Sequence, residues 1–425
     1  KASPQILDDD AKSIVKLNTA SRPSGRPKQK ESFKKAKRSK EITDTLAYVD
    51  TVATVGDVTL EVLDEVVKTQ QLSIAVVGEA LDGIRRMFDG AVFKRPKALV
   101  IKGNHSRSVE SNIRFVLPDS ATNVKIREEL INDTKLASSD IVISILGVGT
   151  FSLVDIERMR TWHEVSKKLT KARKLVKFVE KIVIDDDHKE VERQRILHMI
   201  PFMNVDRVFS ANGHNISFLD LAGYGGDQWL SDSCVFLASL RVVKEAEPQT
   251  WQNPKYVTVV DPLYLQLSDV ERRNQYIDTK DHIFTEMRSN RIVCCPTYVD
   301  IEFPHWCGII FDMERKIVWK YDPLHKKSNL DAVQEVISGV FMKFMSSHME
   351  MQAKTFTGWR QCDGHSCGVL VVQWLEQYLS LVRSTPPDAS IPLAHDDKLD
   401  SKQLAYERYK HFSYVLDTVV TNVDT

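Results

Sequence analysis

Features that identify several classes of protein are scarce in this chain of 425 residues. It contains only six cysteines, all after residue 230, and no two of them form a Cys-x-x-Cys pair. This argues against a disulfide framework and against structural zinc, and it is typical of a reducing compartment. No apolar run reaches the roughly 18 residues of a membrane span, so we expect a soluble protein without membrane contact.

A net charge is also lacking, because 58 lysines and arginines balance 58 acidic side chains. The charge of the whole molecule therefore favours neither nucleic acid nor membranes as partners. Hydrophobic residues make up 42% of the chain, and its length is sufficient for two or three globular domains. The first residues, Lys1-Ala-Ser-Pro4, contain no methionine, as expected of a fragment or a processed product, and a signal upstream stays open.

Residues 1–42 are polar and include a strongly basic stretch at 22–40. Such a segment cannot bury enough apolar surface to fold alone, so we expect disorder. The cluster Lys34–Arg38 has the density of a nuclear-import signal, which favours a nuclear over a cytoplasmic location, and Gly25-Arg-Pro27 resembles the core of a minor-groove DNA reader. A solvated basic linker has the same composition, so weak nucleic-acid contact through 22–40 is one of several alternatives.

Residues 43–205 predict a separate, helix-rich region. Apolar residues at helical spacing begin at Val77, and residues 141–146 predict a buried strand. Ser152 is expected to open a long helix that runs toward Val183. No motif in this region carries chemistry, so its function stays open.

A different pattern begins near residue 206 and predicts a second domain over 206–425. Ser231 or Asp232 can cap a helix there. Two β-rich runs, 306–313 and 316–321, are separated by a polar turn and predict a hairpin. The domain is expected to end in a helix over about 403–420.

The stretch Gln361-Cys-Asp-Gly-His-Ser-Cys-Gly368 runs directly into an apolar segment with helical spacing. Cys367 is therefore expected in the first turn of a buried helix. Unpaired backbone N–H groups and the positive end of the helix dipole favour a thiolate there, as a nucleophile requires. A buried structural cysteine is the alternative, because free cysteine is among the most buried residue types.

The predicted hairpin brings a second pair of functional groups together. In a short hairpin centred on 313–315, facing residues have numbers that sum to about 627–629, and His305 and Asp322 sum to 627. We therefore expect these two as cross-strand neighbours. A carboxylate beside a histidine fixes its tautomer and raises its basicity, so the histidine can take a proton from Cys367.

The loop before Cys367 offers two further groups. The amide of Gln361 can donate a hydrogen bond to the oxyanion that forms when a thiolate attacks a carbonyl. Gly364 allows positive φ or close approach of the backbone. His365 is a rival base, but a histidine two residues from Cys367 on a tight loop is poorly placed for orientation by Asp322, so His305 is preferred.

These elements occur in the order His305-Trp306, Asp322 and Gln361-x-x-Gly364-x-x-Cys367, preceded by Trp229-Leu-Ser-Asp232. The order resembles the Ulp1/sentrin-specific protease family of cysteine peptidases over about residues 210–420. This resemblance implies an α+β, papain-like domain with a central helix packed on a mixed sheet. It further implies cleavage after the Gly-Gly terminus of SUMO or another ubiquitin-like modifier, without a metal or organic cofactor.

The residues that match the family's catalytic groups are His305, Asp322 and Cys367, with Gln361 at the oxyanion. The resemblance also implies a substrate-binding set, in which the two indole rings cover a narrow tunnel for the di-glycine. This set is Trp229, Asp232, Trp306, Gly364 and Gly368.

The chain departs from the family pattern at Ser366, where the family usually has Asp, at Asp363, where it often has Asn, and at Ser231, where it has Asn. The modifier therefore stays open. Two other functions are also open: an inactive modifier-binding domain in a nucleic-acid-associated or mobile-element-encoded protein, and acyl transfer on the same fold.

Overall fold

The structure is a computed structural model, and it describes part of the chain. The described residues are 73–79, 101–102, 120–121, 123–124, 127, 142–145, 149–184, 187–246, 256–265, 291–342, 350–393 and 398–421. The predictions for 1–42, including the basic stretch and Lys34–Arg38, lie outside them. The division into 1–42, 43–205 and 206–425 stays a prediction.

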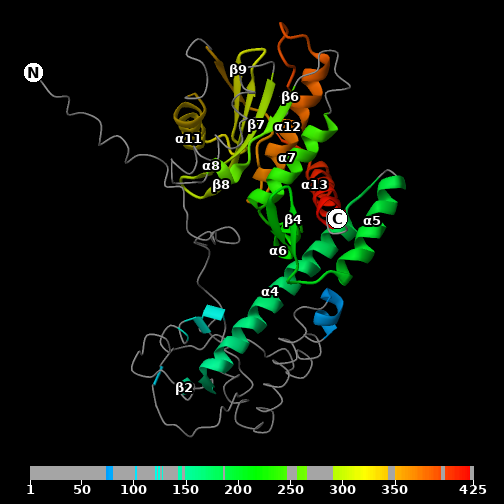
Figure 1. Ribbon diagram of the computed structural model, residues 1–425, viewed down its shortest axis with the longest axis vertical. Helices are drawn as coiled ribbons and strands as arrows, with labels where there is room; N and C mark the ends of the chain where they lie inside the picture. Colours follow the sequence, from blue (N-terminus) through cyan, green and yellow to red (C-terminus); the bar gives the residue numbers. More distant parts are fainter. Residues whose placement is uncertain are drawn as a thin grey trace, which may run out of the picture. The chain divides into compact units, whose positions relative to one another are not determined.

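The chain forms two compact units. One comprises Val208–Thr425 together with Phe178–Glu190, and the other comprises Val191–Arg207 and the described part of Lys30–Lys177. Figure 1 shows the elements of both, coloured along the sequence. Each unit is considered by itself below.

The predicted strand and long helix of the earlier region are both present. Strand β2 (Val142–Ile145) lies between β1 (Ile101–Lys102) and β3 (Gly149–Ser152) in an antiparallel sheet. Ser152 ends β3, and the long helix α4 (Leu153–Lys181) begins at the next residue. Residues 74–79, which include Val77, are helical. The helix α5 (Asp187–Met199) and the short η3 (Ile200–Phe202) follow.

A five-stranded sheet forms the centre of the other unit, with the strand order β10-β9-β8-β7-β6. The three inner strands β7, β8 and β9 run antiparallel, whereas β6 and β10 at the edges pair in parallel with their neighbours. The sheet is therefore mixed, as expected for the predicted α+β class. The strands are β6 (Tyr256–Val259), β7 (Arg291–Asp300), β8 (Pro304–Asp312), β9 (Ile317–Tyr321) and β10 (Gln352–Phe356).

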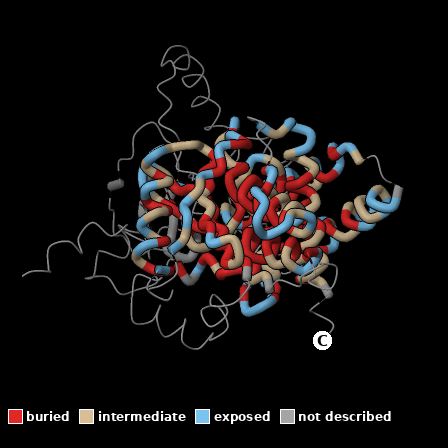
Figure 2. The backbone as a smooth tube through the Cα atoms, turned by 90° about the horizontal axis from the view of Figure 1, so that it is seen from above, coloured by how far each residue is buried: buried red, intermediate tan, exposed pale blue. Residues whose placement is uncertain are grey.

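Helices cover both faces of this sheet. The helices on one face are α7 (Asp232–Glu245) and α12 (Cys367–Ser384), and α13 (Ser401–Thr421) packs on them. The other face carries α11 (Lys327–Val336) and η5 (Ile337–Phe341). The remaining elements are β4 (Val208–Ala211), which pairs with β5 (His214–Ser217), and the short helices α6 (Phe218–Ala222) and α8 (Pro262–Leu265). Buried residues are most frequent in the central strands and helices, where the tube in Figure 2 is red.

Successive residues of the inner strands point to opposite faces. On β8, the side chains of Cys307, Ile309 and Phe311 join the cluster with α11 and η5. Gly308 faces α12 instead, since a Cβ atom added there would lie 2.8 Å from the Trp374 ring. Only a residue without a side chain lets the central helix approach the sheet this closely.

The hairpin between β8 and β9 has a four-residue turn, which is longer than the two-residue turn that a centre at 313–315 suggests. The ladder ends at Asp312 opposite Ile317, so four residues form the turn, and Lys316 has a φ of 54°. Arg315 from this turn donates to Asp312 at 3.0 Å and to the carbonyls of Thr385 and Pro386 at 2.7 and 2.9 Å, just beyond the end of α12. The turn is thereby tied to the carboxyl end of the central helix.

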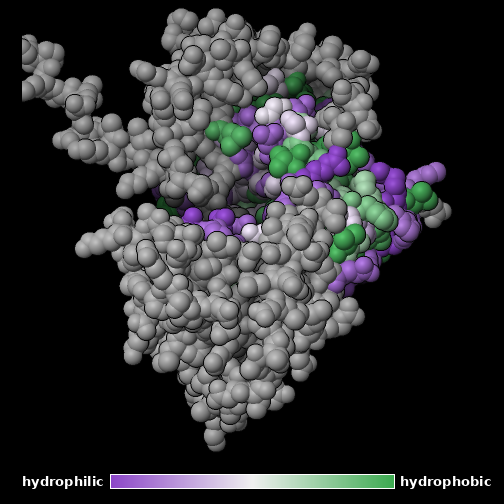
Figure 3. Space-filling model, turned by 60° about the horizontal axis from the view of Figure 1, so that its bottom comes forward, coloured by the Kyte–Doolittle hydropathy of each residue, from purple (hydrophilic) through white to green (hydrophobic). Residues whose placement is uncertain are grey.

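The surface of the described residues mixes polar and apolar side chains (Figure 3). Within the described part of the chain, no helix is long and apolar enough to cross a membrane.

Candidate active site

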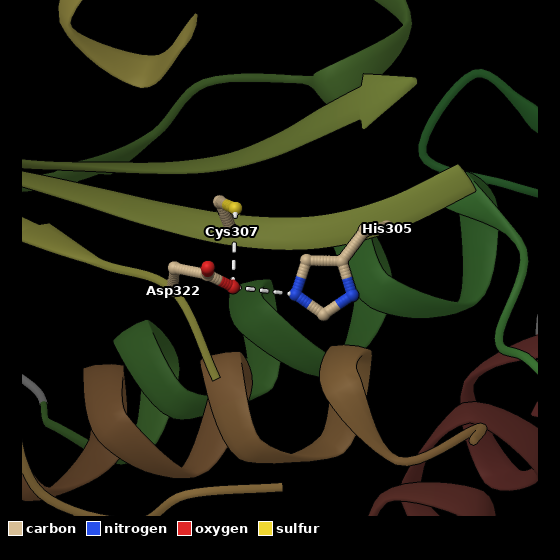
Figure 4. A group of neighbouring side chains, drawn as sticks. All are labelled: His305, Cys307 and Asp322. Atoms are coloured by element: carbon tan, nitrogen blue, oxygen red, sulfur yellow. Dashed lines mark hydrogen bonds and ion pairs between the residues drawn. The ribbon is translucent and has the colours of Figure 1, made fainter. Parts of the chain in front are cut away.

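A buried histidine and carboxylate form the centre of the site (Figure 4). His305 Nε2 lies 2.7 Å from Asp322 Oδ1, and each residue is 1% exposed. Asp322 also accepts from the backbone N–H groups of Leu324 and Lys326 at 2.9 and 2.7 Å and from Asn329 Nδ2 at 3.1 Å. Burial alone would raise the pKa of Asp322, but the contact with His305 and these N–H donors outweigh it and lower the pKa below its usual value.

The proximity of His305 and Asp322 was predicted correctly, but the residue that faces Asp322 lies two positions further along β8 than predicted. Paired residues of β8 and β9 have numbers that sum to 629, for example Gly308 and Tyr321. Continuing this register by one residue places Asp322 opposite Cys307 rather than opposite His305. Because His305 and Cys307 point to the same face, the imidazole reaches the carboxylate as a diagonal neighbour.

Cys367 is the first residue of α12, as the apolar pattern predicted, and it is 1% exposed. The proximity of Cys367 affects the pKa of His305. Burial by itself disfavours the imidazolium, but the charge of Cys367, its hydrogen bond to His305 and the contact with Asp322 raise the pKa to about 9. Since Nε2 of the ring faces Asp322, Nδ1 is the nitrogen left for the sulfur. This geometry can hold a thiolate and an imidazolium as an ion pair.

A different cysteine, Cys307, adjoins the carboxylate of Asp322. Cys307 Sγ lies 3.9 Å from Asp322 Oδ1, and the ligand atoms of His305, Cys307 and Asp322 all lie within 4.8 Å of one another. Burial raises the pKa of the Cys307 thiol well above its usual value, and the negative charge of Asp322 raises it further. A neutral thiol at this position is a poor nucleophile. Cys307 belongs to the core cluster under α11, and nothing near it in the sequence indicated its contact with Asp322.

The loop before α12 is organised by a carboxylate. Asp363 accepts from the backbone N–H groups of His365 and Ser366, each at 2.8 Å, and from the hydroxyl of Ser366 at 2.6 Å. Burial alone would raise the pKa of Asp363, but these donors and the nearby His365 lower it. Gln361 Nε2 also donates to this residue, to its carbonyl at 2.9 Å and to Oδ1 at 3.1 Å. The amide predicted to stabilise an oxyanion is therefore engaged within the loop.

His365, the rival base, belongs to a different set of contacts. Its ring nitrogen Nδ1 lies 3.2 Å from Ser366 Oγ and 3.3 Å from an amino group of Arg408. Asp322 is paired with His305 instead. The geometry therefore favours His305 as the base, as the sequence argument did.

The residues predicted to bind substrate lie around the same loop. Trp229 Nε1 donates to the carbonyl of Gly364 at 2.5 Å, and Trp306 Nε1 donates to the carbonyl of Leu230 at 3.1 Å. Trp306 is only 2% exposed. A Cβ atom on Gly368 would lie 3.0 Å from Val235 and 3.3 Å from Trp306, so this glycine has a packing role. Asp232 is buried at the start of α7, directly after the cap Ser231, and contact of all these residues with a substrate stays a prediction.

Sequence reasoning missed three residues: Asp363 as the organiser of the loop, Arg408 from α13, and Asn329 from α11. The signal for Asp363 was present, because an Asp side chain in a tight loop commonly accepts hydrogen bonds from the backbone N–H groups two or three residues later. Arg408 and Asn329 gave no such signal, since their contacts depend on how distant elements pack.

Comparison with known proteins gives structural similarity only. No family model and no curated protein matches this chain. The yeast Ulp1 protease domain in complex with the SUMO orthologue Smt3 has a TM-score of 0.38 at 12% identity, over 56% of this chain and 99% of that one. The Ulp1-like SUMO protease catalytic domain of Chaetomium thermophilum has a TM-score of 0.38 at 15% identity, over 56% and 96%.

A third structure is the Xanthomonas campestris effector protein XopD bound to ubiquitin. Its TM-score is 0.30 at 16% identity, over 43% of this chain and 90% of that one. The chain itself is an α+β protein with a mixed sheet around a central helix.

Proposed function

We propose that this chain is a cysteine peptidase or isopeptidase that cleaves after the C-terminal Gly-Gly of SUMO or another ubiquitin-like modifier. The observation that supports this most directly is the buried His305–Asp322 pair beside Cys367 at the start of α12. A base that is oriented by a carboxylate and lies beside a cysteine is the arrangement that thiol acyl chemistry requires.

In the proposed reaction, the Cys367 thiolate attacks the carbonyl carbon of the last glycine, and His305 holds the proton. The oxyanion that forms is stabilised by the backbone N–H of Cys367 and by Gln361, which exchanges its hydrogen bond with Asp363 for one with the oxyanion. The C–N bond then breaks as His305 gives its proton to the leaving amine. Water, deprotonated by His305, hydrolyses the thioester and frees Cys367.

The substrate-binding part of the proposal rests on the two indoles. Trp229 is held over the loop by its bond to Gly364, and Trp306 packs against Gly368 at the start of α12. We propose that these residues and Asp232 line the path of the di-glycine, where bulkier residues would be excluded. A nuclear location and weak nucleic-acid contact through 22–40 are proposals from composition alone.

Electrophilic probes built on the C-termini of SUMO and ubiquitin test the proposal. We expect a covalent adduct with at least one modifier, located on Cys367 by peptide mass spectrometry. The adduct should be lost in Cys367→Ala and retained in the matched controls Cys307→Ser and Cys362→Ser. No adduct with any modifier, or an adduct that persists in Cys367→Ala, would contradict the assignment.

The same experiment separates the rival functions. Modifier binding without an adduct would favour an inactive binding domain, and labelling of Cys367 by an acyl donor instead of a modifier would favour acyl transfer. For the oxyanion role, Gln361→Ala should lower turnover by about 10²–10³-fold. An unchanged turnover would remove Gln361 from the mechanism.

A further inference from the structure

A buried arginine on the last helix joins two loops of the site. Arg408 lies on α13 and is only 2% exposed. Its Nη1 donates to the carbonyl of Gly223 at 3.2 Å and to that of Gln228, the residue before Trp229, at 2.8 Å. Its Nη2 donates to the carbonyl of His365 at 3.1 Å, just before Cys367. One side chain therefore holds together the backbone segments that carry an indole and the cysteine.

A guanidinium buried this deeply needs a compensating negative charge. Burial lowers the pKa of Arg408, and the strongest opposing influence is Asp363. A hydrogen-bonded path connects the two through Ser366. The Ser366 hydroxyl donates to Asp363 Oδ2 at 2.6 Å and lies 3.4 Å from Arg408 Nη2, from which it accepts.

Ser366 is the residue immediately before Cys367 and is itself buried. A displacement of Ser366 by its partners Asp363 or Arg408 therefore moves the start of α12 and the sulfur of Cys367 with it. Nucleophilic attack is sensitive to such shifts, since a displacement of about 1 Å can cost on the order of 10²-fold in rate.

We propose that Arg408 is a positioning residue for Cys367 and that Asp363, acting through the Ser366 hydroxyl, is the charge that keeps the guanidinium in place. The proposal rests on Cys367 being the reactive group of the proposed function. It goes beyond that function by assigning a role to a charge network that does not contact the substrate.

The rate at which iodoacetamide alkylates Cys367 tests this without any modifier, so it gives a result even if no ubiquitin-like protein is cleaved. Exposed Cys362 in the same protein is the internal reference. Asp363→Asn retains an oxygen for the loop N–H groups, but it removes the charge and turns an –NH₂ group toward the Ser366 hydroxyl, so we expect alkylation of Cys367 to slow about 10–100-fold. Adding Ser366→Asp restores a carboxylate next to Arg408 and should recover most of the loss.

Two substitutions of the arginine complete the test. Arg408→Lys retains the charge but cannot reach oxygens of both loops, so it should slow alkylation as much as Arg408→Gln does. Lys410→Gln is the matched control on the same helix, because that amine pairs with Glu376 at 2.8 Å, and it should leave the rate unchanged. Thermal unfolding of each variant identifies any that is not folded at the assay temperature.

The outcomes separate positioning from a general structural role. If Asp363→Asn reacts like the parent, the charge is not needed and the proposal is wrong. If the variant that also carries Ser366→Asp is no faster than Asp363→Asn alone, the carboxylate serves only the loop N–H groups, and the proposal is equally wrong. Recovery in that double variant supports it, because a purely local loop defect would not be repaired by a charge at another position.

Discussion

Asp322→Asn is the substitution that tests the catalytic pair most directly. Oδ1 of this carboxylate faces His305 and the N–H of Leu324, and Oδ2 faces the N–H of Lys326 and Nδ2 of Asn329. All four partners donate when His305 carries its proton on Nε2. An asparagine would therefore turn its –NH₂ group toward two donors in either orientation, so it removes the charge and also leaves hydrogen bonds unmade.

The size of the effect follows from the pKa of His305. Burial disfavours the imidazolium, and Cys367 and Asp322 together raise the pKa from 6.5 to about 9. This difference corresponds to about 3 kcal/mol in favour of the charged form. Without the Asp322 charge, burial is opposed mainly by Cys367, so the pKa should fall below 9. The tautomer of His305 is also no longer fixed, and we expect kcat/KM to drop by about 10³–10⁴-fold.

The assay is the pH dependence of kcat/KM with a fluorogenic modifier substrate. The imidazolium that protonates the leaving amine exists only below its pKa, so the rate of the parent should decline above about pH 9. In Asp322→Asn this decline should begin at a lower pH. Asp312→Asn is the control for the pH of the decline, since this buried carboxylate of the same hairpin pairs with Arg315 rather than with His305; its rate can fall, but the decline should stay at the parent's pH. A decline at the parent's pH in Asp322→Asn would refute the reasoning.

Three further substitutions test the surrounding fold. Gly368→Ala places a Cβ atom 3.0 Å from Val235 and should lower the free energy of unfolding by about 1–3 kcal/mol in urea titrations, and an unchanged value would remove the packing role. Ser231→Ala removes the side-chain oxygen that caps α7 and should cost about 1 kcal/mol by the same measurement. His411 is buried, and burial followed by its cationic neighbours lowers its pKa well below 6.5. The unfolded state then binds a proton that the folded state does not, so the free energy of unfolding should fall between pH 7 and pH 5, and it should fall less in His411→Gln.

The local parts of the site could be predicted because their signals lie within a few residues. An apolar helical pattern directly after a polar loop predicted Cys367 at a helix start, and α12 begins there. The two β-rich runs predicted the hairpin and the proximity of His305 and Asp322. The register was less certain because it depends on the turn, and a four-residue turn moves the facing residue to Cys307.

The other contacts of the site join residues that are far apart in the sequence, so they could not be predicted from it. Ser366 stood out as a departure from the family pattern, but nothing near it in the sequence indicated that Arg408 lies beside its hydroxyl. The partners are 42 residues apart in the chain, and their meeting depends on how α13 packs against α7 and α12. Likewise, the proximity of Cys307 to Asp322 follows from the strand register rather than from any motif.

The anchor of Arg315 at the far end of α12 has a mechanical consequence. With 18 residues, α12 is about 27 Å long, and it carries the sulfur at one end, while its other end is fastened to the hairpin that carries His305. Cys367 on α12 and His305 on the hairpin are therefore connected at both ends of the helix. As a result, neither α12 nor the hairpin can shift along its axis without the other. Substitutions at Arg315 should alter the reactivity of Cys367, although Arg315 lies at the other end of α12. Variants that affect catalysis should therefore be found at both ends of this helix.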